Sequence, residues 1–139
     1  KEGATVNYAN KDGDTALTVA AKHGHLEAVA ALIKEGAIVN HANIDGGTAL
    51  MFAALGGHLE TVAALIKEGA TVNHANNHGG TALMQAARHG HLKTVVALIK
   101  EGATVNQASN NGTTARSLAL RYRHKRVVRY IVKNADKVQ

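Results

Sequence analysis

Nine histidines are the residues of this sequence with the widest chemical scope, because imidazole is a common metal ligand and a general base. Some of them lie close along the chain, such as His23 with His25 and His74 with His78. Neither pair has an evident third ligand beside it, whereas zinc sites draw on three or four protein ligands. We therefore expect structural or solvated histidines, with no metal ion and no other cofactor.

Nucleophilic and phosphate-binding motifs are also missing from the sequence. There is no Cys, and the two serines, Ser109 and Ser117, lie outside any nucleophile-elbow pattern. No Gly-x-x-x-x-Gly-Lys-Ser/Thr loop is present to cradle a nucleotide. The carboxylates form no evident pair for acid–base catalysis. We expect no enzymatic activity.

The length and composition fit a single globular domain. The chain has 139 residues, and a hydrophobic fraction of 45% is enough to form a core. No apolar run approaches the ~18 residues that cross a bilayer, so we expect no membrane insertion. The first residues contain no apolar signal-peptide segment. We expect an intracellular protein, cytoplasmic or nuclear, and not a secreted one.

Basic residues gather at the C-terminal end. From Arg116 onward there are eight Lys and Arg against one acid, a net charge of +7, whereas the first 115 residues have eight bases and nine acids, a net of −1. One interpretation is a solvated cap. The other is a surface for an acidic protein, a nucleic acid or a membrane. Only Tyr122 and Tyr130 supply aromatic rings there, and no nucleic-acid fold signature occurs, so we do not expect nucleic acid as the main partner.

The sequence repeats itself with a period of 33 residues. The dipeptide Val-Asn occurs at 6–7, 39–40, 72–73 and 105–106, and residues 39–71 and 72–104 differ at only seven of 33 positions. Such a period is typical of stacked repeats that share one core. We expect a single array, divided into the end of a missing repeat (1–7), three repeats (8–40, 41–73, 74–106) and a C-terminal capping repeat (107–139).

Each repeat is predicted to contain two short helices. Thr15 can cap a first helix over 16–23, and the spacing of apolar residues predicts a second helix over 26–35. Gly36 then lies where a helix end favours a left-handed residue. The stretch 39–48, rich in Asn, Asp and Gly, is predicted to be a turn or hairpin loop. Helices this short need neighbouring copies to bury their apolar faces.

The motifs Gly-x-Thr-x-Leu, Ala-Ala-x-x-Gly-His-Leu and Leu-Ile-Lys-x-Gly-Ala-x-Val-Asn recur in this order, and the unit they form resembles the ankyrin repeat. One departure is consistent, since alanine replaces the proline of the family's Thr-Pro-Leu-His motif. The resemblance implies an all-α solenoid of stacked helix-turn-helix units with loop or β-hairpin fingers. It also implies a partner held on a concave face by loop tips and first helices. The histidines that it implies to be structural are His25, His58, His91 and His124.

The two ends of the array differ in character. Residues 1–7 are identical to 67–73, so we expect the first repeat to expose an apolar leading face that drives self-association. In the last copy Arg116, Lys125 and Arg129 replace apolar residues of the earlier copies. We interpret those three changes as a polar face that no further repeat covers.

Differences between the copies indicate where a partner binds. They concentrate in the loops and first helices, and the second copy places Ile44 and Leu55 where the other copies are polar or charged, with Phe52 on the helix between them. An apolar centre with a charged rim is typical of a protein interface. For Met51, Phe52 and Met84 packing between repeats is the alternative. The candidate partner-binding residues are Lys11, Asp12, Lys22, His23, Ile44, Asp45, Met51, Phe52, Leu55, Asn77, His78, Met84, Gln85, Arg88, His89, Arg121 and Tyr122.

Three functional hypotheses follow from these observations. The first is a non-catalytic interaction module that binds a protein or peptide on its concave face. The second is an engineered or structural repeat scaffold without a natural ligand, which the near-identity of the copies favours. The third is binding of an acidic partner or nucleic acid through the basic C-terminal repeat.

Overall fold

Threonine begins the first helix of every repeat in the computed structural model, which describes residues 5–138. The hydroxyls of Thr15, Thr48, Thr81 and Thr114 each accept a hydrogen bond from the backbone N–H three residues later. This satisfies one of the free donors at the helix start. The expected cap at Thr15 is therefore confirmed, and its equivalents recur along the chain.

Four helix pairs follow one another, and we call them units one to four. The first helices are α2 (Ala16–Lys22), α4 (Ala49–Leu55), α6 (Ala82–Arg88) and α8 (Ala115–Arg121). The second helices are α3 (Leu26–Lys34), α5 (Leu59–Lys67), α7 (Leu92–Lys100) and α9 (Lys125–Val138). The first two helices of the array end one residue before the predicted limits. Gly36, with φ +100°, follows α3 in the left-handed conformation expected of it.

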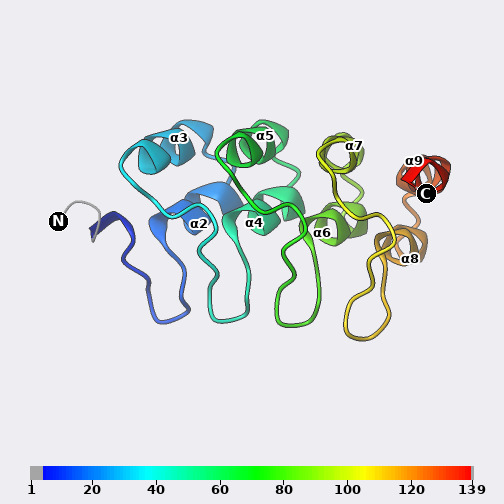
Figure 1. Cartoon of the computed structure of the whole chain (residues 1–139), viewed down its shortest axis with the longest axis horizontal. Helices are drawn as coiled ribbons and strands as arrows, with labels where there is room; N and C mark the ends of the chain where they lie inside the picture. Colours follow the sequence, from blue (N-terminus) through cyan, green and yellow to red (C-terminus); the bar gives the residue numbers. More distant parts are fainter. Residues whose placement is uncertain (1–4, 139) are drawn as a thin grey trace.

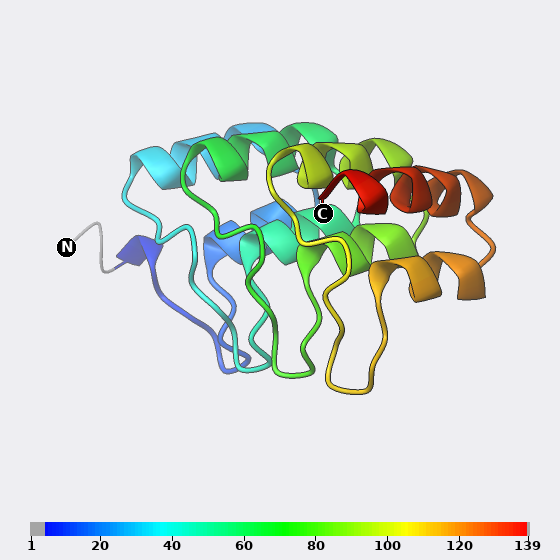
Figure 2. The ribbon, with the colours of Figure 1, turned by 45° about the vertical axis from the view of Figure 1, so that its right-hand side comes forward.

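The helices form two layers, one of first helices and one of second helices, with a row of loops projecting from the first layer (Figure 1). Figure 2 shows the same layers from a turned view, with the four loops side by side. We call these loops, centred on 10–14, 43–47, 76–80 and 109–113, the fingers. Each is closed by a backbone hydrogen bond across it, such as Asn43 N–H to Gly47 O at 2.9 Å. The described residues include one isolated β-bridge, Ala108 with Thr114, and no longer strand pairing.

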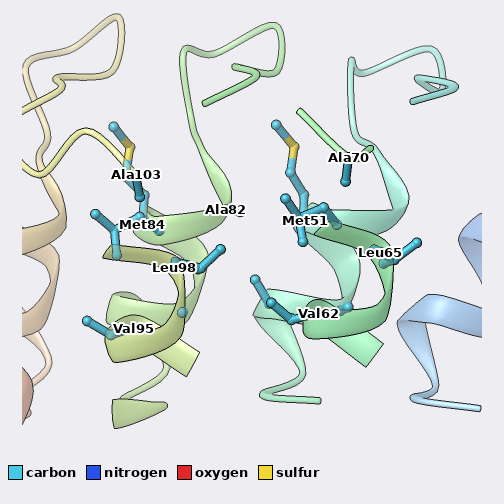
Figure 3. Packing of buried hydrophobic residues seen from close by; sticks show 14 of the residues in the cluster. Met51, Val62, Leu65, Ala70, Ala82, Met84, Val95, Leu98 and Ala103 are labelled. Atoms are coloured by element: carbon cyan, nitrogen blue, oxygen red, sulfur yellow. The ribbon is translucent and has the colours of Figure 1, made fainter. Parts of the chain in front are cut away.

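The core lies between successive units. Leu50 and Leu83 are buried residues of the first helices α4 and α6. Val62 and Val95 are buried in the second layer (Figure 3). Alanines such as Ala53 are fully buried, and their small side chains let neighbouring helices approach closely. The all-α solenoid is therefore confirmed. None of the helices in the described part of the chain is long and apolar enough to cross a membrane.

Side chains that recur in each unit also join the units by hydrogen bonds. Asn40 donates through Nδ2 to the carbonyl of Gly69 at 3.0 Å, and its Oδ1 accepts from the N–H of Thr71 at 2.8 Å. The Nε2–H of His91 donates to the carbonyl of Leu55 at 2.9 Å. Equivalent bonds made by His58 and His124 confirm the structural role that the resemblance implied for three of the four Gly-His residues.

The end face of unit four is only partly polar. Arg116 is exposed where Leu50 is buried, as expected. Lys125 and Arg129 are exposed as well, but they do not replace fully buried residues, because the equivalent Leu59 and Ala63 of unit two are half-buried and exposed, respectively. Leu120 moreover is 55% exposed where the earlier units carry a fully buried alanine.

Candidate functional site

Most of the predicted partner-binding residues are accessible. Phe52 and Gln85 are partly buried, and the methionines are buried. The exposed members of the set are Lys11, Asp12, Lys22, His23, Ile44, Asp45, Leu55, Asn77, His78, Arg88, His89, Arg121 and Tyr122.

Met51 and Met84 belong mainly to the core, although each also lines one of the two hollows described below, so their contact with a partner stays a prediction. Their side chains are only 4% and 3% exposed, and they occupy corresponding places in neighbouring units (Figure 3). Each lies three residues after the threonine cap, on the side of the first helix that meets the stack. Packing between units, the alternative interpretation, applies to both.

Phe52 and Leu55 share a hollow of about 200 Å³ between units two and three. Asp45 lines it from the finger of unit two, and Asn76 and Gln85 line it from unit three. A helical spacing of three residues places Phe52 and Leu55 on the same side of α4. Asn43 lines the hollow as well, so it combines an apolar wall with one carboxylate and three amides.

Gly47 makes room for the ring of Phe52. A methyl group at Gly47 would lie 3.2 Å from Cζ of Phe52, so the ring lies directly against the glycine backbone. The equivalent positions of units one and four carry Asp14 and Thr113. The pairing of a glycine with an aromatic ring is therefore specific to unit two, and it holds the ring at the wall of the hollow.

A larger hollow of about 380 Å³ lies between units three and four. Its charged and titratable lining residues are His78, Arg88 and Arg121, and its other polar groups are amides and hydroxyls. Asn76 and Gln85 line this hollow and the preceding one. The two hollows are therefore adjacent, with Asn76 and Gln85 between them, and we call them together the groove.

Arg88 is held at the edge of the groove by an aromatic ring. Its Cζ lies 5.3 Å from the centroid of the Tyr122 ring, a cation–π contact between unit three and unit four. None of its guanidinium N–H groups donates a hydrogen bond within the described residues, so they remain available. No ion pair engages Arg88 or Arg121 among the residues that the structure describes.

His89 lies beside this arginine, and its pKa is below the ordinary value of 6.5. Burial is the main cause, and the positive charges of Arg88, His91 and His124 act in the same direction. The ring also stacks on His91 at a centroid distance of 6.1 Å. His89 therefore stays neutral near pH 7, so Arg88 and Arg121 supply the charge of this part of the groove.

Ile44 lies apart from the apolar wall. Its side chain is 63% exposed at the finger tip, and it lines neither hollow. Its backbone N–H donates to the carbonyl of Asp12 at 3.1 Å, and its carbonyl accepts from Nδ2 of Asn77 at 2.9 Å. The predicted apolar centre is therefore divided: Phe52 and Leu55 lie together on α4, and Ile44 lies at the tip of a finger.

The candidate residues of unit one also lie outside the groove. Lys11, Asp12, Lys22 and His23 are exposed but line neither hollow, and the same holds for His89 and Tyr122. Sequence reasoning in turn missed several residues that do line it. These are Asn43, Gly47, Asn76, Gly80, Ser109, Asn110, Asn111, Thr113 and Leu118. Asn111 and Leu118 could have been found, because they share repeat positions with His78 and Gln85.

A third hollow, of about 650 Å³, lies on the end face of unit four. Leu120, Val128 and Val132 form its apolar floor. Four basic side chains, Arg123, Lys125, Arg129 and Lys133, surround them. Part of the basic C-terminal charge therefore borders an apolar surface.

The histidines do not gather with other ligands. Among the described residues there is no group of three or more His, Cys, Asp or Glu side chains that could hold a metal ion. His41 and His74 instead donate to the carbonyls of Gly13 and Gly46, at 2.8 and 3.1 Å, in the preceding finger. His41 and His74 therefore connect neighbouring fingers by hydrogen bonds.

The sequence matches the family described as ankyrin repeats (3 copies), over residues 2–76 and again over residues 68–139. Together the two matches span nearly the whole chain. A comparison with curated proteins found no match.

Proposed function

The chain belongs to the ankyrin-repeat family, whose repeats are generally protein–protein interaction modules, and on this premise we propose that it binds an extended segment of a partner protein in its groove. Binding is non-catalytic, in keeping with a family that is typically non-enzymatic. The side chains that we assign to the partner are those that line the groove, with Phe52 and Leu55 as its apolar anchor point.

The observation that carries the proposal is where the units differ. Residues 39–71 and 72–104 differ at seven of 33 positions, so most of each unit serves the shared stack. Three of the differing pairs line the groove: Asp45 with His78, Phe52 with Gln85, and Leu55 with Arg88. Residues that stacking leaves free to vary thus meet on one accessible surface.

The dimensions of the hollow beside Phe52 and Leu55 favour a side chain of a partner over a separate small molecule at that place. The hollow beside Phe52 and Leu55 has a volume of about 200 Å³, below the ~300 Å³ of typical small-molecule sites. Leu55 is 37% exposed, and Phe52 is partly buried. One apolar side chain of the partner would cover the Phe52 ring and the Leu55 methyl groups and remove them from water, which favours binding.

The test is to select binders from a random peptide library and map their site on the labelled protein by NMR. We expect the backbone signals of Phe52, Leu55 and Gln85 to shift on titration, while those of Glu27 and Glu60, in the second layer, stay in place. Shifts confined to the second layer or to the end face would contradict the proposal. An Ile38→Thr variant is the control, because Ile38 is exposed, lines neither groove hollow and aligns with Thr71 and Thr104.

A second candidate function is binding of a polyanion at the end face of unit four. The four bases around Leu120 and Val132 favour it. Affinity for heparin or an oligonucleotide would then fall steeply between 50 and 200 mM salt, because counterions are released on binding. A flat salt dependence would exclude this function. The engineered-scaffold hypothesis and the intracellular setting stay predictions from the sequence.

A further inference from the structure

We propose that the groove selects a segment with an apolar side chain and, three residues away, a carboxylate. The inference rests on the proposed function and specifies the chemistry of the partner. It depends on the order of the two hollows along the array, apolar between units two and three and basic between units three and four.

Charge in this half of the molecule is strongly one-sided. Residues 69–135 contain ten Lys and Arg and a single carboxylate, Glu101. Glu101 follows α7 in the second layer and lines neither hollow of the groove. Arg88 and Arg121 therefore line the groove without a carboxylate of this chain as partner. An anionic group of the bound segment would form ion pairs with them.

The geometry at Arg88 favours a carboxylate in particular. Cζ of Arg88 lies over the Tyr122 ring, 5.3 Å from its centroid, and this contact restrains a side chain that would otherwise move freely. The in-plane N–H groups remain free to form the paired hydrogen bonds that a carboxylate accepts. His89 lines neither hollow and is kept neutral by its lowered pKa, so Arg88 and Arg121 are the charges that a carboxylate would meet.

The opposite end of the groove excludes a carboxylate. Asp45 lines the hollow that holds Phe52 and Leu55, so a second negative charge there would be repelled. The acidic residue of the partner must therefore lie toward unit four and its apolar residue toward unit two. This order fixes the register of the partner along the array.

The spacing follows from the stack. Leu55 and Arg88 end the neighbouring helices α4 and α6, and packed helices lie ~8–10 Å apart. An extended chain advances ~3.3 Å per residue, so about three residues separate the two contacts. Arg121, which ends α8, lines the same basic hollow and can share the carboxylate or bind a second one three residues further on.

The test is a positional library of decapeptides with a fixed leucine at position five and every other position randomised in turn. On the wild-type protein we expect Asp and Glu to be enriched three residues from the leucine, on one side only. The best peptide should bind about fivefold more tightly than its Glu→Gln analogue, as for an accessible ion pair. Arg88→Gln combined with Arg121→Gln should abolish that difference, and Lys22→Gln, a base outside the groove, should not.

The outcomes separate the two proposals. If leucine-containing peptides need Phe52 and Leu55 but show no preference for an acid, the carboxylate inference is overturned and the proposed function stands. If binding does not depend on Phe52 and Leu55, the proposed function itself fails. If an oligonucleotide displaces every peptide and binds with a steep salt dependence, the groove is a polyanion site and the acidic-segment inference is wrong.

Discussion

The Nε2–H of His91 donates to the backbone carbonyl of Leu55, one unit earlier, at 2.9 Å. The bond joins a residue that recurs in every unit to a residue that differs between units. His58 holds the carbonyl of Lys22, and His124 that of Arg88, in the same way. The histidines thus hold the backbone of the last residues of the first helices, Lys22, Leu55 and Arg88. The side chains of these three residues remain free to vary.

Replacing His91 by alanine should weaken the stack without changing the groove. The loss of one inter-unit hydrogen bond is expected to lower the free energy of unfolding by ~0.5–1.5 kcal/mol. Urea denaturation measures this directly. His25→Ala is the matched control, because in the described part of the chain His25 has no carbonyl partner in another unit. Equal losses for the two variants would contradict a stacking role for His91.

Gly57→Ala should be more damaging than Gly36→Ala. Both glycines have a positive φ, +70° and +100°, so alanine pays ~1–2 kcal/mol of backbone strain at either position. Only at Gly57 would the new methyl group also meet another side chain, Nδ1 of His91 at 2.5 Å, because Gly36 has open space around it. Equilibrium unfolding of both variants isolates the steric part, and equal losses would show that the histidine moves aside freely.

Met84→Ala should behave as a core substitution. The buried side chain leaves a cavity, so we expect a loss of ~2–4 kcal/mol in the free energy of unfolding. Leu55→Ala, at an accessible position, should cost less than ~1 kcal/mol. Thermal and urea unfolding compare the two variants. The reverse order would place Leu55 in the core and would remove it from the groove.

The lowered pKa of His89 predicts a pH dependence of stability. Above pH 7 the imidazole is neutral in both states, and its contribution to stability is complete. As pH falls through the unfolded-state value near 6.5, the unfolded chain takes up a proton before the folded chain does, so stability declines. The melting temperature of the His89→Gln variant should decrease less between pH 7.5 and pH 5.5 than that of the wild type. An identical loss in both proteins would contradict this assignment.

Local signals were sufficient to predict the helices, because each is bounded by residues with a specific backbone role. Thr15 and Gly36 mark their ends to within one residue. The inward and outward sides of α4 were harder to predict. This helix has only seven residues, too few for periodicity to assign adjacent Met51 and Phe52 to different sides. Leu120 was missed for a related reason, since its exposure depends on which unit covers it and not on its type.

The most direct measurement compares affinity and stability in a variant that gives unit two the groove residues of unit three, Phe52→Gln with Leu55→Arg. Unit three already carries Gln85 and Arg88 at these positions, so the stack should accept both changes. We predict that a library-selected peptide binds at least tenfold more weakly while the free energy of unfolding changes by less than ~1 kcal/mol. Unchanged affinity, or a loss of stability as large as the loss of binding energy, would contradict the assignment of Phe52 and Leu55 to the partner.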